Sequence, residues 1–139
     1  MGYVSQNAII FYAGIHENIR MFDENICDEQ INSALKKVGM YERIQALPDK
    51  LDYVCKDDGS NFSSGETQLL ACARLFLKNN KIVILDESTA KIDKQEEEKL
   101  RIAFNELIKN KTAFLIAHRT ETLKDADIQL PVKNGKVQH

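Results

Sequence analysis

The spacing of apolar side chains divides the chain into a helical first part and a second part in which strands and helices alternate. Apolar residues recur at helical spacing from Asp28 to Val38, which predicts a helix that Asp28 can cap and Gly39 ends. Shorter helices are predicted over residues 16–22 and 41–47.

Two apolar runs in the second part predict buried strands. Lys81–Asp86 and Thr112–Ala117 show no polar alternation, which is typical of strands covered on both faces in a parallel sheet. Helices are predicted over about 65–78 and 94–110. This order of elements predicts an α/β fold whose parallel strands are joined by right-handed crossovers.

The C-terminal stretch predicts only small elements. A short helix is expected over residues 120–126. Two small strands, over 128–132 and 136–138, are expected to pair through a turn at Asn134-Gly135, a dipeptide favoured in tight hairpins.

Composition excludes several classes of protein. The 139 residues are 43% hydrophobic and 29% charged, as in a soluble globular protein, and the net charge of −2 argues against nucleic acid as a partner. The longest apolar stretches are roughly six residues, against the ~20 of a membrane helix. The three cysteines form no Cys-x-x-Cys pair, so neither a disulfide framework nor a zinc site is indicated.

Two strand ends carry candidate chemistry. Asp86 and Glu87 end the first apolar strand, and ligands of open α/β sheets lie beyond such ends. An Asp there can hold Mg²⁺, and a neighbouring Glu can polarise a water. His118 follows the second strand and can hydrogen-bond a phosphate. Taken singly, the acids can equally well cap the next helix, and a lone histidine at a strand end is usually structural.

A helix N-terminus supplies a third candidate. Ser63, Ser64 and Gly65 precede or begin the helix over 65–78 and offer hydroxyl and backbone N–H groups to an anion. An ordinary serine cap with Glu66 in the first turn explains the same residues. On its own, the structural explanation is the stronger one.

The order of these motifs resembles the nucleotide-binding domain of the ATP-binding cassette (ABC) transporter family. The stretch around Gln6 resembles the Q-loop of ABC exporters, and Phe62-Ser-Ser-Gly-Glu66 resembles the signature Leu-Ser-Gly-Gly-Gln. The remaining matches are Ile82–Glu87 to the Walker B strand, Ser88–Asp93 to the D-loop and His118 to the switch histidine. The residues around Ser63 and Asp86 are most similar to those of the multidrug-resistance-associated group.

The resemblance implies a partial P-loop NTPase-like ABC ATPase domain over residues 1–139, with a helical subdomain at about 13–60. The signature helix, Walker B strand, D-loop and switch histidine would form the core over about 61–139. In the family, two such domains enclose two ATP molecules head to tail, attached to transmembrane domains at the cytoplasmic face of a membrane. The whole protein would be an ATPase that powers transport, while the chain itself would be soluble.

The resemblance also implies residue roles. Glu87 would be the general base, His118 the γ-phosphate switch, and Gln6 would approach Mg²⁺ and the attacking water. Asp86 would help to hold Mg²⁺. The ATP of the partner domain would be contacted by the signature residues Ser63, Ser64, Gly65 and Glu66. Asp93 would form part of the contact between the two domains. Asp93 can also cap the helix that starts at Lys94, with Glu96 completing a capping box.

The chain departs from the family in three ways. It contains no Gly-x-x-x-x-Gly-Lys-Ser/Thr loop, the Walker A segment that grips the β- and γ-phosphates. We expect that loop upstream of Met1 in a longer chain, and therefore expect no ATP hydrolysis and very weak nucleotide binding from these residues alone. Ser64 and Glu66 replace a glycine and the glutamine of the signature. Glu66 would either repel the partner's phosphate or point to solvent and stabilise the helix N-terminus.

The third departure concerns the sheet. Without further strands it would have an open edge and exposed apolar faces, which predicts self-association, strand exchange or marginal stability. Two other functions remain open from the sequence: a non-transporting ABC ATPase, and a degenerate regulatory cassette.

Overall fold

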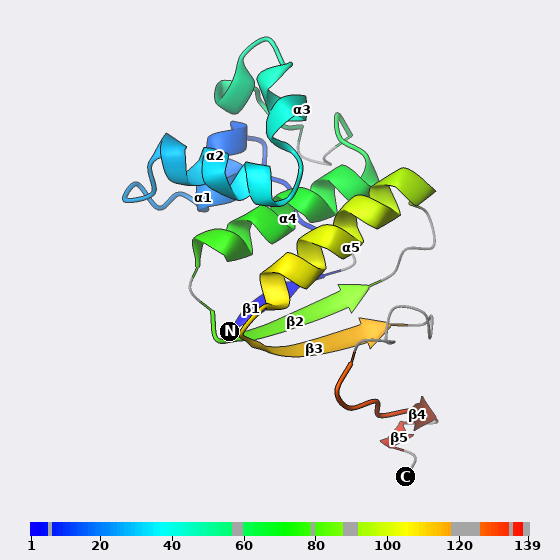
Figure 1. Ribbon diagram of the computed structural model, residues 1–139. Helices are drawn as coiled ribbons and strands as arrows, with labels where there is room; N and C mark the ends of the chain where they lie inside the picture. The colour runs from blue at the N-terminus through cyan, green and yellow to red at the C-terminus, as the bar shows by residue number, and fades with distance from the viewer. Residues whose placement is uncertain are drawn as a thin grey trace.

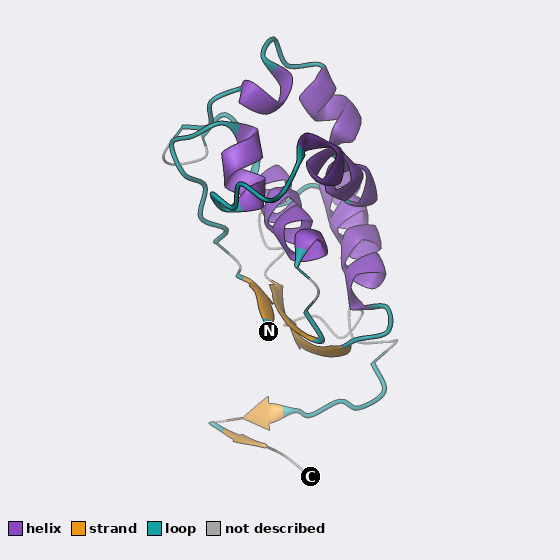
Figure 2. Ribbon diagram, turned by 90° about the vertical axis from the view of Figure 1, so that its left-hand side faces the viewer, coloured by secondary structure: helices purple, strands orange, loops and turns teal. Residues whose placement is uncertain are grey.

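The structure is a computed structural model that describes residues 1–5, 7–56, 60–78, 80–87, 92–117, 126–133 and 135–137. A three-stranded parallel sheet carries helices on one face, and further helices pack above them (Figures 1 and 2). The elements are, in chain order, β1 (Gly2–Val4), α1 (Ile15–Arg20), α2 (Asp28–Lys37), α3 (Tyr41–Gln45), the 3₁₀ helix η1 (Lys50–Asp52), α4 (Ser64–Leu77), β2 (Ile82–Glu87), α5 (Lys94–Ile108), β3 (Thr112–Ala117), β4 (Val132–Lys133) and β5 (Lys136–Val137).

The sheet has the order β1-β2-β3, with β2 in the centre. Both pairs are parallel, which confirms the predicted α/β architecture and its two apolar strands. The strand β1, whose residue Gly2 lies opposite Val83, was not predicted. It is only three residues long, too short for a hydrophobic pattern to mark it.

The expectation that both faces of the strands are covered is wrong for the described part of the chain. Val83 and Leu85 of β2 are fully buried, and Figure 1 shows α4 and α5 over one face of the sheet. On the opposite face, Phe114 is 57% exposed and Ile116 49% exposed. Within the described ranges, helices therefore pack on one face of the sheet, and the open face that the sequence also predicted is present.

Helix α4 is the centre of the packing. It contacts α1 and α2 on one side and α5 and β1 on the other (Figure 1). Leu69, Leu70, Cys72 and Ala73 are buried, so the helix is apolar around most of its circumference, as expected for a helix inside a core. The helical first part of the chain thereby packs against the sheet through α4.

A buried asparagine connects α1, α4 and the segment that precedes α1. Asn18 has no exposed surface, and its side-chain amide donates hydrogen bonds to the carbonyl oxygens of Phe11, Ala13 and Gly14, at 3.0, 3.3 and 3.2 Å. Its Oδ1 accepts a 2.8 Å hydrogen bond from the Phe11 N–H. Arg74 of α4 donates through Nε to the Asn18 carbonyl oxygen at 2.7 Å. Burial lowers the pKa of Arg74, an effect that the nearby Cys55 opposes.

Local chemistry explains where the helices begin and end. Cys27 is the N-cap of α2, so the predicted cap, Asp28, is instead the first helical residue. The Gln30 side chain accepts a 3.0 Å hydrogen bond from the Cys27 N–H. This bond makes Cys27 the N-cap, one residue before the predicted cap. At the other end Gly39 has a φ of 70°, and Met40 N–H donates to the Leu35 carbonyl oxygen, the hydrogen bond of a Schellman motif.

The C-terminal hairpin is confirmed, because β4 and β5 pair antiparallel with Val132 opposite Val137. Its first strand is shorter than predicted and begins at Val132. The helix predicted over 120–126 lies outside the described residues except for Ala126. None of the helices that the structure describes is long and apolar enough to cross a membrane.

Replacing Asn18 by alanine should lower the free energy of unfolding by about 2–4 kcal/mol, because several buried backbone groups would lose their partner. Urea unfolding followed by circular dichroism measures this loss. The matched control is Asn105→Ala at an exposed position of α5, which should change stability by less than about 0.5 kcal/mol. Equal effects of the two substitutions would contradict the structural role of Asn18.

Candidate functional site

The carboxyl ends of the parallel strands bring the candidate residues to one edge of the sheet. Asp86 pairs with Ile116 and Glu87 with Ala117, so the last residues of β2 and β3 lie at the same level. The residue that follows Ala117 in sequence is His118. In open α/β sheets this edge is where ligands bind. Figure 1 shows that the N-terminal ends of α4 and α5 lie on the same side of the molecule.

Three predicted residues are not fully described. Gln6 and His118 lie outside the described residues, and of Glu87 only the backbone, as the last residue of β2, is described. Their predicted roles therefore stay predictions. Asp86, the four signature residues and Asp93 are all described.

Asp86 is half-buried at the end of the central strand and is hydrogen-bonded by Tyr3 of β1. The Tyr3 hydroxyl donates to the Asp86 Oδ2 at 3.2 Å. Loss of solvent around the hydroxyl, followed by the hydrogen bond and the negative charge of Asp86, raises the pKa of Tyr3 above its ordinary value. The tyrosine thus holds one carboxylate oxygen in a fixed direction and leaves the other free of any described partner.

The chemistry of Asp86 fits Mg²⁺, which is commonly held by one or two carboxylates together with phosphate oxygens and waters. Within the described residues, no group of three or more His, Cys, Asp or Glu side chains is close enough to hold a metal ion. Asp86 alone would therefore supply only part of a Mg²⁺ coordination shell, and phosphate would have to supply more.

The signature residues form a closed cap on α4. Ser63 is the N-cap, and its hydroxyl accepts a 3.0 Å hydrogen bond from the Glu66 N–H. In return the Glu66 Oε2 accepts a 3.1 Å hydrogen bond from the Ser63 N–H, which completes a capping box. Ser64 is exposed and Gly65 buried at the first turn of the helix.

Glu66 neither points to solvent nor stands as an uncompensated charge. Its Oε1 is 3.0 Å from the Nε of Arg43, a residue of α3, and the guanidinium group also lies over the Phe62 ring at 5.8 Å. The glutamate that replaces the usual glutamine is therefore neutralised from the helical part of the chain, and both of its oxygens are occupied.

Asp93 caps α5, as predicted. Its Oδ1 accepts hydrogen bonds from the N–H groups of Gln95 and Glu96, both at 2.9 Å. The predicted capping box with Glu96 does not form. The Glu96 carboxylate instead accepts a hydrogen bond from the Ser63 hydroxyl, so the N-terminal turns of α4 and α5 are linked by their side chains.

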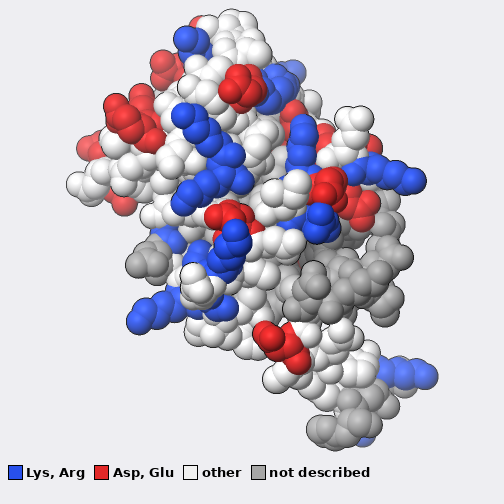
Figure 3. All heavy atoms as spheres, viewed as in Figure 1, with Lys and Arg blue, Asp and Glu red and all other residues white. Residues whose placement is uncertain are grey.

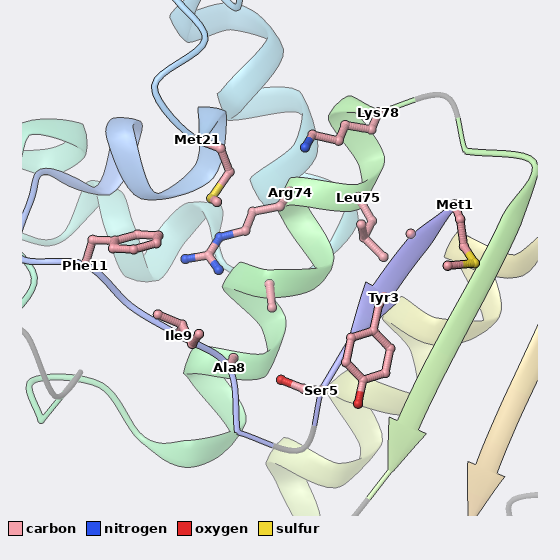
Figure 4. A pocket seen from close by; sticks show the side chains of 12 residues that line it. Met1, Tyr3, Ser5, Ala8, Ile9, Phe11, Met21, Arg74, Leu75 and Lys78 are labelled. Carbon is pink, nitrogen blue, oxygen red and sulfur yellow. The ribbon is translucent and has the colours of Figure 1, made fainter.

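A hollow of about 310 Å³ lies between β1, the segment 8–11 and α4 (Figure 4). Arg74 and Lys78 of α4 line it with positive charge, while Ile9, Phe11 and Met21 supply apolar surface. The rings of Phe11 and Phe22 meet edge to face 6.0 Å apart close by. On the face shown in Figure 3, basic side chains gather over the middle of the molecule, with acidic side chains among them.

Sequence reasoning missed three members of this arrangement: Tyr3 at Asp86, Arg43 at Glu66 and Glu96 at Ser63. Their partners are 83, 23 and 33 residues away in the chain. No local pattern reports such contacts, because they depend on how separate elements pack. A lone arginine on a short helix or a second glutamate in an acidic first turn is ordinarily a solvated side chain.

Comparison with known proteins identifies the family. Residues 1–90 match the family model of ABC transporters. The chain is 39% identical over 132 residues to the β-(1→2)glucan export ATP-binding/permease protein NdvA of Brucella melitensis, which covers 95% of the chain and 22% of that protein. It is 36% identical over 138 residues to ATP-binding cassette sub-family C member 4 of Mus musculus, covering 99% of the chain and 10% of that protein.

The fold agrees with that relationship. The structure of a bacterial Atm1-family ABC exporter with ATP bound superposes with a TM-score of 0.86 and 28% sequence identity, over 99% of this chain and 24% of the exporter chain. The chain thus spans less than a quarter of the length of these relatives. Together with the strand-end acids and the signature helix, these matches show that the chain belongs to the ABC transporter family and forms part of an ATP-binding domain.

Proposed function

We propose that this chain is the part of an exporter's ATP-binding domain that supplies the hydrolytic groups and the signature, and that ATP cleavage in the whole protein drives a substrate across a membrane. The observation that carries this proposal is the pair Asp86-Glu87 at the end of the central parallel strand, level with the end of β3. The family membership of the chain supports the same function.

Each of four residues would have a separate role in ATP hydrolysis. Asp86, oriented by Tyr3, would hold Mg²⁺, which when bound neutralises charge on the phosphate oxygens. Glu87 would accept the proton of the attacking water, since a carboxylate at the strand end can act as a general base. Gln6 would position that water, and His118 would hydrogen-bond the γ-phosphate.

The signature would serve a second ATP-binding domain. In the proposed head-to-tail pair, Ser63, Ser64 and Gly65 face the nucleotide that the partner domain holds, and Asp93 contributes to the contact between the two domains. The N-terminus of α4, with its partial positive charge, supports such a role. We place residues of about 13–60 in a helical subdomain and residues 61–139 in the catalytic core.

Transmembrane domains would contact the surface formed by Ile9, Phe11, Tyr12 and Phe22. All four side chains are exposed although they are large. Three of them lie in the segment between β1 and α1, and Phe22, which follows α1, meets the Phe11 ring. An apolar patch of this kind marks an interaction surface. The proposed position of the domain is therefore the cytoplasmic face of a membrane, with this surface toward the membrane domains.

The chain of 139 residues should bind Mg-ATP with a dissociation constant weaker than about 1 mM and should not hydrolyse it. The reason is that none of its glycines lies in a Gly-x-x-x-x-Gly-Lys-Ser/Thr loop, the group of donors that grips the phosphates. Titration calorimetry and a phosphate-release assay measure both quantities. A micromolar dissociation constant would show that the chain holds ATP by other residues.

In the whole protein, Glu87→Gln should lower the rate of ATP hydrolysis by about 10²–10⁴-fold and leave ATP binding unchanged, because the amide cannot accept the proton. Phosphate release and nucleotide binding are measured on the same preparation. Glu29→Gln, an exposed position of α2, makes the same change of charge and should retain full activity. Undiminished turnover in Glu87→Gln would exclude Glu87 as the base.

The open apolar face of the sheet should cause the chain to self-associate, because Tyr3, Phe114 and Ile116 are about half exposed on it. Sedimentation velocity should show concentration-dependent association that Phe114→Lys reduces. Ile102→Lys, at an equally exposed position on α5, should leave association unchanged. A wild-type chain that sediments as a monomer at all concentrations would contradict this expectation.

A further inference from the structure

Asp86 receives its hydrogen bond from the neighbouring strand. Tyr3 of β1 pairs with Ile84 in the parallel ladder, so Tyr3 and Asp86, two residues further along β2, are diagonal neighbours on one face of the sheet. An aromatic side chain is long enough to reach a diagonal neighbour. The Tyr3 hydroxyl does so and donates to Oδ2 of Asp86 at 3.2 Å. Figure 4 shows the ring running from β1 toward the end of β2.

The other neighbours of Asp86 on this face are aliphatic. Ile84 precedes it by two residues on β2, and Ile116 lies opposite it on β3. The residues on either side of Tyr3 are buried while Tyr3 itself is exposed, so the strand turns only Tyr3 toward this face. Within the described ranges, the hydrogen bond on Asp86 therefore comes from Tyr3, and its Oδ1 has no described partner.

This hydrogen bond limits how the carboxylate can meet a cation. A carboxylate offers a cation either one oxygen or both, and contact through both requires that the two oxygens turn toward the same ion. Tyr3 belongs to a strand and is held in the sheet, so Asp86 cannot turn Oδ2 away without losing the hydroxyl. A hydrogen bond to a charged acceptor is stronger than one between neutral groups. Asp86 is therefore prepared for a contact through Oδ1 alone.

The number of oxygens that a carboxylate offers affects which cation it prefers. Mg²⁺ demands near-octahedral geometry at about 2.0–2.1 Å, which two oxygens of one carboxylate, held close together, fit poorly. Ca²⁺ is larger, takes roughly six to eight oxygens at about 2.3–2.6 Å, and readily accepts both oxygens of one carboxylate. A carboxylate restricted to one oxygen therefore loses binding energy toward Ca²⁺ and keeps it toward Mg²⁺.

We propose that Tyr3 is a specificity-determining residue, whose hydroxyl restricts Asp86 to a one-oxygen contact and so favours Mg²⁺ over Ca²⁺ beside the nucleotide. This inference rests on the proposed role of Asp86 in holding Mg²⁺. Tyr3 acts through Asp86, as a positioning residue, and needs no contact with the cation. Because Tyr3 is 53% exposed, replacing it by phenylalanine keeps the ring on the sheet and removes only the hydroxyl.

The test measures how tightly the whole protein binds a non-hydrolysable ATP analogue with Mg²⁺ and, separately, with Ca²⁺. The quantity compared is the dissociation constant with Ca²⁺ divided by that with Mg²⁺, on one preparation. In Tyr3→Phe this ratio should fall about tenfold below the wild-type value, because both oxygens of Asp86 become available to Ca²⁺. The matched control is Tyr41→Phe, which removes the hydroxyl of a ring that contacts Lys36 at the start of α3 and should keep the wild-type ratio.

An unchanged ratio in Tyr3→Phe would overturn the inference. So would an equal loss of affinity with both cations, which a purely structural role of Tyr3 predicts, or an equal fall of the ratio in Tyr41→Phe. Asp86→Asn separates this failure from that of the proposed function, because it should strongly weaken binding with either cation. If it does so while Tyr3→Phe keeps the wild-type ratio, the inference fails alone. Wild-type binding with Mg²⁺ in Asp86→Asn would refute the proposed role of Asp86 as well.

Discussion

The buried amide of Asn18 is the constraint on which the rest of the structure depends. It hydrogen-bonds the backbone before α1, and Arg74 of α4 donates hydrogen bonds to its Oδ1 and to the Asn18 carbonyl oxygen. A buried network of this kind is costly unless every member is satisfied, so it permits one arrangement of these parts. The segment between β1 and α1 is thereby fixed to the helix that carries the signature.

Because the hydrogen bonds of Arg74 fix the C-terminal half of α4, they also fix the position of its N-terminus. Fourteen residues make a rod of about 21 Å, with Ser63 at its start. The same helix contacts the helical part of the chain, the sheet and α5. In the proposed function, this connects the apolar surface around Phe11 and Phe22 to the N-terminal end of α4, which would face the partner's nucleotide. Movement of one would then be transmitted to the other through packed side chains rather than through a flexible link.

Charge at the start of α4 is arranged by contacts from two other helices. Arg43 neutralises Glu66, while Glu96 adds a carboxylate that the Ser63 hydroxyl binds. The sequence left two alternatives for Glu66: repulsion of the partner's phosphate, or a solvent-exposed side chain that stabilises the helix N-terminus. In the structure Glu66 completes the helix cap, and Glu96, outside the motif, accepts a hydrogen bond from the Ser63 hydroxyl. The open face of the sheet likewise depends on how the elements pack, because helices cover only one side of the described strands.

Much of the fold was readable from local patterns. The apolar runs of β2 and β3, the glycine that ends α2 and the serine and aspartate caps of α4 and α5 all act within a few residues, where sequence reports structure directly. The order of the motifs likewise determined the family. The pairing of the short strand β1 with β2 was decided by packing. So were the contacts of Tyr3 with Asp86, Arg43 with Glu66 and Glu96 with Ser63, which join residues far apart in the chain. The sequence by itself determined which chemical groups the protein carries and on which elements; only the tertiary structure decided which charges meet, because that depends on distances between elements that no local pattern encodes.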